Sequence, residues 1–387
     1  MSVRKGKKQS GQSLQNTNRL WDLGGDKINI KQKKSIKPMS RWDITGTTEM
    51  KKQIFLFAIL LGSFVTFAQQ QIATLQHGDS ISMYYGVRAF VDAHTAASNG
   101  DIITLSSGTF DTCRITKAIK LRGAGALPDS NNLVPTSFNS LMVGVHQNND
   151  SLGCFEMEGI FVQNLKLLPC TSPKFVRCAF GTLITGGYTN SNLVVNNAQF
   201  INCVIRGYDN SSHCENALFA NSVVWYVKAD KPTTFNNCFV RLGCYSSHYY
   251  YYLNAYNSVI FCESSSYSIT TSNSSSGVLA INGGTFFHNI IIASGFNYIY
   301  NSTNKRYQTI ASVFENLNGG FNFDNTYTLK DSVANSFRSA DGTEVGIHGG
   351  VLPFAWTPSY MSIKKCNVAN RSTADGKLSV DIEVITE

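Results

Sequence analysis

The sequence lacks the cysteine spacing that marks structural zinc sites and thioredoxin-like redox sites. None of its ten cysteines belongs to a Cys-x-x-Cys pair, which is the spacing that both kinds of site use. We therefore predict no metal site. All ten follow residue 68, so export would place them where disulfides can form; they are Cys113, Cys154, Cys170, Cys178, Cys203, Cys214, Cys238, Cys244, Cys262 and Cys366.

A run of apolar residues long enough to span a bilayer is also missing, since a transmembrane helix needs about 20 of them. The apolar stretch at residues 54–67 is shorter and follows two lysines. Residues 66–68 (TFA) then resemble the small-residue site at which signal peptides are cleaved. We interpret residues 50–68 as a signal peptide and expect a secreted or cell-surface protein, with no membrane span after cleavage. A retained, uncleaved anchor is the alternative.

The positive charge of the whole chain does not extend to its mature part. Lys and Arg outnumber Asp and Glu by 33 to 25, and a net charge of +8 would by itself favour an acidic partner such as nucleic acid. Residues 1–68 hold 13 basic and 4 acidic side chains, which leaves 20 against 21 in the rest. We therefore expect no nucleic-acid partner. Residues 1–49 are polar, basic and without hydrophobic period, and we interpret them as a disordered extension from a mispredicted translation start.

Helical periodicity is nearly absent from residues 150–315, where a short motif recurs instead. The motif is an Asn, then a small or apolar residue, then two apolar residues. Repeats of about 20 residues cannot bury a core singly, but stacked repeats can, so the pattern predicts a solenoid. The motif begins at Asn202, Asn221, Asn237, Asn257 and Asn289, at intervals of 19, 16, 20 and 32 residues.

These five asparagines are predicted to form the bends between short strands. An Asn tolerates the left-handed backbone conformation that a tight bend needs. Its amide can also bond to the Asn of the next coil, so we expect a structural Asn ladder. The strand residues that follow each Asn should point alternately into the core and out to the surface. Because the spacing is irregular, a sandwich of antiparallel strands is an alternative.

The segment before the repeats combines the pattern of a helix with those of a strand and a turn. Residues 84–98 have apolar positions at helical spacing, and residues 101–105 (DIITL) have the pattern of a strand. This order resembles the entry cap of pectin-lyase-like β-helices, in which a helix precedes a strand and turn of the form G-D-x-I-x-L-x-x-G-x-Y, then a coil of the form K-x-I-x-L-x-G. Residues 87–125 contain both patterns, at Gly100, Asp101, Ile103, Leu105, Gly108 and Phe110 and at Lys117, Ile119, Leu121 and Gly123.

The segment after the repeats, residues 329–350, resembles the closing coil of exported bacterial β-helix repeat proteins. It departs from them at Val333, where Pro is usual, and at His348, where Tyr is usual. The resemblance implies an all-β fold: a right-handed, single-stranded parallel β-helix, or solenoid, over residues 69–350 with an N-terminal capping helix. Residues 351–387 are expected to be a C-terminal extension that ends in a strand.

The family includes polysaccharide lyases, glycoside hydrolases and proteins without known activity. A hydrolase needs paired carboxylates, and a calcium-dependent lyase needs several carboxylates around the ion and a basic residue as catalyst. Residues 151–320 contain only two Asp and five Glu, and the Asn-Thr-Asp, Asp-Asp and Gly-His-Gly motifs of the hydrolases are absent. We therefore expect a non-catalytic surface, adhesion or glycan-binding module without a cofactor. The alternative is a divergent, pectate-lyase-like polysaccharide lyase, which alone would require Ca²⁺.

One set of residues in the repeats suggests a binding surface. Arg206, Trp225, Arg241 and Phe261 stand four residues after the Asn of successive motifs. If the residues directly after each Asn point inward, alternation turns all four outward and stacks them. They would then form a stripe that binds an acidic polysaccharide, with guanidinium groups on carboxylates and rings under sugar faces. The alternative is a self-supporting cation–π ladder, worth about 0.5–1 kcal/mol per exposed pair.

Overall fold

The computed structural model describes the chain from residue 70 onward, with gaps. The predicted extension 1–49 and signal peptide 50–68 lie outside the described residues. None of the helices within the described ranges is long and apolar enough to cross a membrane. The described ranges are 70–127, 134–145, 152–186, 194–210, 214–229, 231–242, 250–251, 253–262, 280–281, 284–293, 303–317, 320–356, 362–368 and 380–385.

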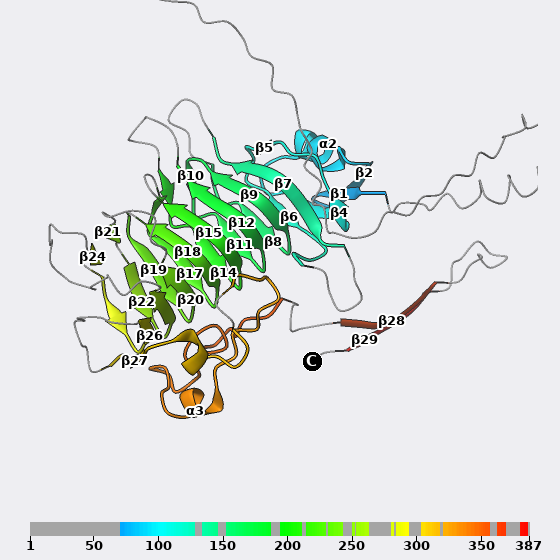
Figure 1. Cartoon of the computed structure of the whole chain (residues 1–387). Coiled ribbons are helices and arrows are strands. Elements are labelled where there is room, and N and C mark those ends of the chain that lie inside the picture. Colours follow the sequence, from blue (N-terminus) through cyan, green and yellow to red (C-terminus); the bar gives the residue numbers. More distant parts are fainter. Residues whose placement is uncertain are drawn as a thin grey trace, which may run out of the picture. The chain divides into compact units, whose positions relative to one another are not determined.

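Most described strands belong to two sheets of eleven strands each, and the chain passes repeatedly from one sheet to the other (Figure 1). We name them sheet A and sheet B. In spatial order, sheet A consists of β2 (Ser80–Tyr85), β1 (Ile72–His77), β3 (Ile102–Leu105), β6 (Lys120–Arg122), β8 (Glu156–Glu158), β11 (Lys174–Val176), β14 (Gln199–Ile201), β17 (Ala217–Ala220), β19 (Thr233–Asn236), β22 (Leu253–Tyr256) and β25 (Phe286–Phe287).

Sheet B is built from the strands that follow those of sheet A along the chain. A further short strand, β5 (Arg114–Ile115), also pairs with β7. In spatial order, sheet B consists of β27 (Lys305–Tyr307), β26 (Ile290–Ala293), β23 (Val259–Cys262), β20 (Phe239–Leu242), β18 (Val223–Ala229), β15 (Val204–Asn210), β12 (Ala179–Thr185), β9 (Phe161–Leu167), β7 (Thr136–Val143) and β4 (Gly108–Thr109).

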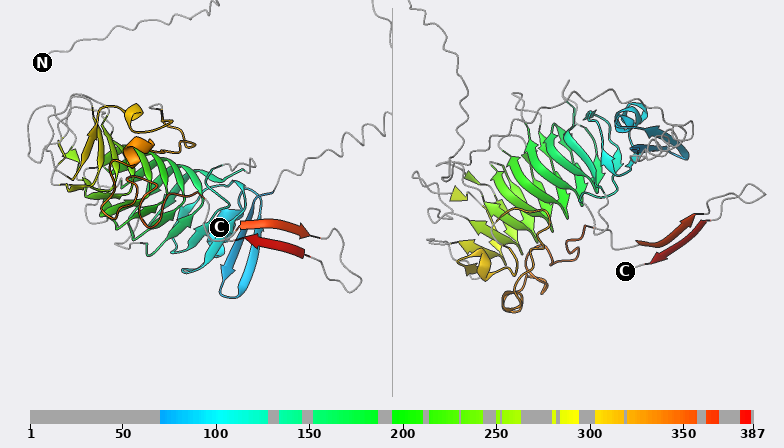
Figure 2. Two further views of the ribbon diagram at one scale, coloured as in Figure 1. Left: turned by 90° about the horizontal axis from the view of Figure 1, so that it is seen from below. Right: turned by 45° about the vertical axis from the view of Figure 1, so that its right-hand side comes forward.

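Pairing in these sheets is parallel except at β1, which pairs antiparallel with both β2 and β3. Both views in Figure 2 show the strands of successive coils lying side by side. The alternative of an antiparallel sandwich is therefore wrong. The structure is mostly β with long parallel sheets, which is compatible with the predicted β-helix.

Smaller elements complete the described part of the chain. Parallel strands β10 (Cys170–Thr171), β13 (Val195–Asn196) and β16 (Cys214–Glu215) form a third sheet, and β21 (Tyr250–Tyr251) pairs with β24 (Ala280–Ile281). Two strands pair antiparallel within the expected C-terminal extension, β28 (Ser362–Val368) and β29 (Val380–Ile385). The helices are α2 (Ala89–Ala96), the 3-10 turn η1 (Ile310–Ser312) and α3 (Asp331–Ala334).

Helix α2 packs its buried residues Ala89, Phe90 and Ala93 against the first strands. It covers only part of the predicted helical segment 84–98, whose first two residues belong to β2. The Lys117 ammonium group closes its C-terminal end by donating to three carbonyls, of His94 (2.7 Å), Thr95 (2.8 Å) and Ala97 (2.6 Å). A cation at this end also complements the helix dipole.

Four of the five predicted bend residues have the left-handed backbone. The φ angles are 53° at Asn202, 45° at Asn221, 52° at Asn237 and 51° at Asn257. The fifth position was predicted one residue late. His288 makes that bend with φ 55°, and His, like Asn, is enriched in this conformation among non-glycine residues.

Asn289 instead stands in the column after the bends, where its Oδ1 accepts from the Ser258 N–H at 2.9 Å. It also makes an amide-to-amide bond of the predicted kind, to Asn304 at 3.1 Å. The side-chain amides of two bend residues, Asn221 and Asn257, bond to the C-terminal segment. Asn221 donates to the carbonyls of Ile347 (3.0 Å) and Gly349 (2.7 Å).

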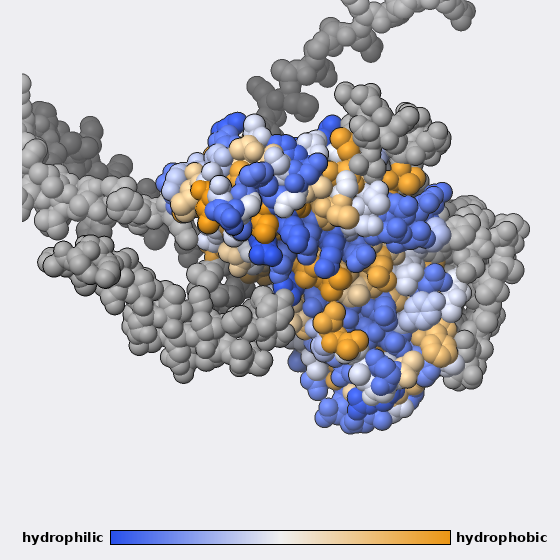
Figure 3. All heavy atoms as spheres, turned by 180° about the vertical axis from the view of Figure 1, so that it is seen from behind, coloured by the Kyte–Doolittle hydropathy of each residue, from blue (hydrophilic) through white to orange (hydrophobic). Residues whose placement is uncertain are grey.

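Two apolar clusters hold the structure together. The first fills the space between the sheets and includes a stack of four rings. The centroid distances between successive rings are 4.9 Å for Phe175 and Phe200, 4.7 Å for Phe200 and Phe219, and 5.0 Å for Phe219 and Phe235. The second covers the outer face of sheet B from β15 to β26 with residues from 310–347. Elsewhere, on the face in Figure 3, hydrophobic residues lie in small groups among hydrophilic ones.

The predicted closing coil, residues 329–350, therefore takes a different place from the one expected. It contains α3 and turns and adds no strand to either large sheet. Val333, Val345 and Ile347 pack against the outer face of sheet B. The Gly346 N–H also donates to the carbonyl of the bend residue Asn257 at 2.8 Å.

Candidate functional site

All four residues of the predicted stripe lie on the outer face of sheet B. Their inward neighbours belong to the core between the sheets, and Arg241 pairs with Phe261 across adjacent strands. The prediction of an open stripe is nevertheless wrong, because Trp225 is 1% exposed and Arg241 5% exposed. Only Arg206 is exposed, and Phe261 is half-buried. The C-terminal segment covers the rest, as part of the second apolar cluster.

A β-bulge places Arg241 between aromatic rings. The register of β18 and β20 pairs Val224 with Val240 and then Val227 with Leu242, so two residues of β18 oppose one of β20. The guanidinium carbon of Arg241 consequently lies 4.8 Å from the ring centroid of Trp225, 4.8 Å from that of Tyr226 and 5.6 Å from that of Phe261. The cation–π contacts of the alternative interpretation are thus present. Strict alternation missed Tyr226 because it does not allow for a bulge.

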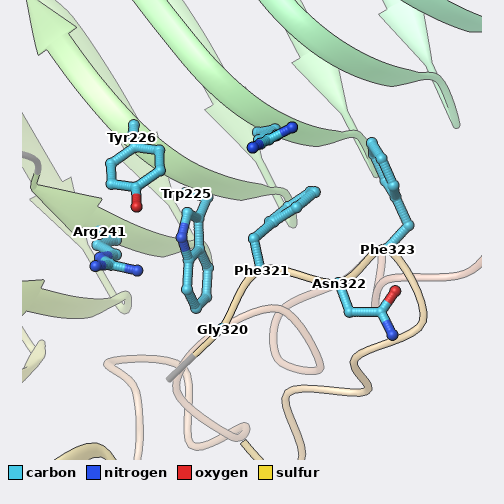
Figure 4. Close-up of a pocket in the computed structure, with 8 residues that line it drawn as sticks. Trp225, Tyr226, Arg241, Gly320, Phe321, Asn322 and Phe323 are labelled. Carbon is cyan, nitrogen blue, oxygen red and sulfur yellow. The ribbon is translucent and has the colours of Figure 1, made fainter. Parts of the chain in front are cut away.

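A cleft of about 450 Å³ opens beside this arrangement. Arg206, Trp225, Tyr226 and Arg241 line it from the strands, and residues 320–323 line it from a loop. Figure 4 shows Trp225, Tyr226 and Arg241 projecting from the strands on one side, with Phe321 and Phe323 projecting from the loop. The cleft therefore combines residues more than one hundred positions apart in the sequence.

Contacts between aromatic rings hold the loop against the sheet. The ring of Phe321 lies 5.7 Å from that of Trp225 and 4.7 Å from that of Phe323. Phe323 in turn meets Phe161 of β9 at 5.6 Å. Edge-to-face contacts of this kind add about 0.5–1.5 kcal/mol each beyond the apolar area they bury. No repeat signal marks the loop, so sequence reasoning missed it.

The lining suits an acidic, ring-shaped ligand better than it suits acid–base chemistry. Among the described residues that line the cleft, none is Asp, Glu, His or Lys. Paired carboxylates for glycoside hydrolysis and a carboxylate cage for calcium are therefore missing from it. Arginine side chains can grip a carboxylate or sulfate, and the Asn322 amide can both donate and accept hydrogen bonds.

Carboxylates do meet basic groups elsewhere, chiefly on the outer face of sheet A. There Glu156 lies 4.0 Å from the Lys120 ammonium and 3.7 Å from that of Lys174, and Glu158 pairs with Arg177. These are partly exposed ion pairs of three basic side chains with two carboxylates. Within the described ranges, no three His, Cys, Asp or Glu side chains are grouped so that they could hold a metal ion.

The buried cysteines are unsuited to nucleophilic chemistry. Eight cysteines are free thiols, namely Cys113, Cys154, Cys170, Cys178, Cys203, Cys214, Cys238 and Cys262. Burial raises the pKa of Cys214 and of Cys238 to about 12, and it raises the pKa of Cys170 and Cys203 strongly as well. Because the thiolate is the reactive species, these side chains are inert at neutral pH. Their role is packing.

Neither a protein-family model nor a curated protein nor a solved structure matches this chain. The cleft formed by Arg206, Trp225, Tyr226, Arg241 and residues 320–323 is the candidate functional site.

Proposed function

We propose that the chain is an exported, non-catalytic module whose cleft binds an acidic polysaccharide at a surface. The observation that carries this proposal is the lining itself, which pairs two arginines with aromatic rings and an amide and includes no carboxylate among its described residues. The exposed Arg206 is the group for a sugar carboxylate or sulfate. Phe321 and Tyr226 are half-buried, and their accessible parts are the surfaces for sugar rings.

Arg241 has a supporting role in this proposal. Three rings surround its guanidinium group within 5.6 Å, so its charge is held in place before any ligand arrives. A fixed cation in a partly dry site attracts an anion more strongly than a mobile one in water, because no ordering is needed on binding. Arg206 would thus contact the ligand directly, with Arg241 behind it.

We infer that the parallel sheets form a right-handed, single-stranded β-helix of the pectin-lyase-like kind, with α2 as its cap and a signal peptide at residues 50–68. The long parallel sheets, the left-handed Asn bends and the entry motif within residues 87–125 support it. A fold of this kind hosts many activities, so the cleft carries the functional part of the proposal.

The test is binding of the purified protein to acidic and neutral polysaccharides, with Arg206→Ala as the variant. Arg122→Ala is the matched control, because Arg122 is likewise an exposed arginine in a strand, but of sheet A. We expect the acidic polymers to bind, the binding to weaken with salt, and only Arg206→Ala to lower the affinity, by about tenfold or more. Equal affinities for all three proteins, or no binding at all, would refute the proposal.

The same samples test the lyase alternative. Incubation with calcium would release unsaturated sugars, detected by ultraviolet absorbance, if the chain cleaved the polymer by elimination. We expect neither this absorbance nor new reducing ends. Their appearance would overturn the non-catalytic part of the proposal and direct attention to the basic residues beside Glu156 and Glu158 on sheet A.

A further inference from the structure

Five neighbouring strands of sheet B share an unusual step. Strict alternation allows one outward residue between two inward ones, as Arg241 stands between the core residues of β20. In the five strands of this group, two residues separate the core side chains. These two-residue steps are 139–140 in β7, 163–164 in β9, 181–182 in β12, 206–207 in β15 and 225–226 in β18.

The register of the strands places these steps side by side. Ser140 pairs with Asn164, Asn164 with Thr182, and Thr182 with Gly207. The flanking core residues of β15 and β18 also pair, which continues the line to Trp225 and Tyr226. The steps therefore form one continuous band across five coils, and the last two of its strands contribute Arg206, Trp225 and Tyr226 to the cleft.

Amide and hydroxyl groups occupy the far end of this band. Asn139, Ser140, Gln163 and Asn164 are all exposed, and we call them the amide row. The Asn164 amide donates to the Asn139 carbonyl at 3.3 Å, which links the two strands. Side chains of this type offer donors and acceptors together, as sugar hydroxyls do. The amide row carries no charge, in contrast to the arginines at the cleft.

Two residues of the band between the amide row and the cleft are glycines, which have no side chain to project from the strands. Gly181 lies between Gln163 and Arg206 in the band, and a Cβ atom there would meet the Gln163 carbonyl oxygen at 2.5 Å. Gly207 lies next to Thr182, and a Cβ atom there would find only the Gly181 oxygen, at 3.8 Å. The Gln163 side chain lies over Gly181, 2.6 Å from where a Cβ atom would stand, whereas at Gly207 the backbone is bare and has room above it.

We infer that the ligand is a linear acidic oligosaccharide that lies across the coils, with an acidic sugar at Arg206 and further sugars on the amide row. This inference depends on the proposed function and specifies its ligand. Neighbouring strands are about 4.8 Å apart, so five strands span about 19 Å, the length of several linked sugar rings. The bare backbone at Gly207 lets a chain pass from Arg206 towards the Gln163 side chain, which lies over Gly181. Guanidinium groups select the charge, and amides and hydroxyls bind the uncharged hydroxyls.

The decisive measurement is affinity, by titration calorimetry, for a series of acidic oligosaccharides of increasing length. We expect affinity to rise up to about four sugars, the number that the five-strand span admits at one ring per coil interval, and then to level off. In Gln163→Ala/Asn164→Ala the longer ligands should lose about tenfold in affinity, equivalent to one or two hydrogen bonds, while the shortest should be unaffected. Gln199→Ala, which changes an amide on sheet A, is the matched control and should change nothing.

A second variant tests the path without removing a hydrogen bond. Gly207→Leu adds a side chain where space is open, so the protein should fold, as unchanged thermal unfolding would verify. It should abolish the gain in affinity with ligand length.

The outcomes separate the two proposals. If no oligosaccharide of any length binds, the proposed function itself fails. If all lengths bind equally, depend on Arg206 and ignore the Gln163/Asn164 and Gly207 variants, the cleft binds acidic sugars but the band is not part of the site.

Discussion

The outer face of sheet A and that of sheet B from β15 to β26 follow the same strand geometry and have opposite surroundings. On sheet A, Lys120, Glu156 and Lys174 stand in neighbouring strands as partly exposed ion pairs. On sheet B, residues such as Phe239 are buried under the segment 310–347. An outward position in a strand is therefore a surface position only where nothing folds over it.

The difference has energetic consequences. Burying a large apolar side chain contributes about 1.5–3 kcal/mol, whereas an exposed ion pair contributes about 0–1 kcal/mol. The covered face of sheet B should consequently stabilise the protein far more than the charged face of sheet A. The covering segment also explains why the cleft lies on sheet B, because the strands line one side of the cleft and residues 320–323 of the segment line the other.

The largest effect is expected at the covered face. Phe239 is 1% exposed and its ring lies 5.6 Å from Trp225, 5.5 Å from Phe314 and 4.7 Å from Tyr327. Phe239→Ala should lower the free energy of unfolding by about 3–5 kcal/mol, since it leaves a cavity. Urea denaturation measures this loss. Leu218→Ala, at a half-buried position of sheet A, should cost clearly less, and equal losses would contradict the comparison.

The attachment of the covering segment should come second. Asn221→Ala removes two hydrogen bonds to this segment and puts Ala at a φ of 45°, and we expect a loss of about 2–3 kcal/mol. Asn221→Gly loses the same hydrogen bonds but adopts the left-handed backbone without strain, so its stability should lie between those of Asn221→Ala and wild type. Asn216→Ala, at an exposed bend with φ 55°, should lose only the conformational part, about 1 kcal/mol. Chemical denaturation measures the free energy of unfolding of the three variants. If Asn216→Ala lost as much as Asn221→Ala, the hydrogen bonds of Asn221 would not contribute to stability.

Mild acid should act on neither outer face first but on the end near α2. Burial, together with the nearby charge of Lys117, lowers the pKa of His94 from 6.5 to about 4. A histidine with a lowered folded pKa binds its proton more readily when unfolded. The contribution of neutral His94 to the free energy of unfolding is therefore complete above pH 6.5 and declines as the pH falls from 6.5 to about 4. Thermal unfolding over this range should show a smaller decline in His94→Gln, and identical profiles would exclude His94 as the cause.

The smallest effect is expected on the charged face of sheet A. Glu156→Gln removes both of its ion pairs, which are partly exposed, and should cost less than about 1 kcal/mol. Salt screens such pairs, so the difference from wild type should shrink at high ionic strength. Thermal unfolding at two salt concentrations measures it. A large loss that persists in salt would mean that this face contributes more than surface charge pairing.

Much of the local structure was readable before the fold was known. The recurring Asn motif predicted four left-handed bends, because few residues other than Gly and Asn accept that conformation. Alternation after each bend predicted the outward direction of Arg206, Trp225, Arg241 and Phe261. At residues 288–289 the same reasoning was wrong by one position. His288 can also adopt the left-handed conformation, and a motif defined by Asn alone places the bend at Asn289.

The candidate site was less predictable. Tyr226 joined it through a bulge, which depends on how β18 pairs with β20 and is not visible in one strand. Phe321, Asn322 and Phe323 joined it through contacts with rings of distant strands, and they carry no repeat signal. The burial of Trp225 and Arg241 has the same origin in the C-terminal segment.

The sequence by itself determined the repeats, four of the five bends and the outward direction of Arg206, Trp225, Arg241 and Phe261, because these follow from backbone geometry within a few residues. Only the tertiary structure decided which outward residues remain exposed. That depends on where residues 310–347 pack, and thus on the apolar area they bury on sheet B. Exposure is a property of two surfaces in contact, and no single stretch of the chain encodes it.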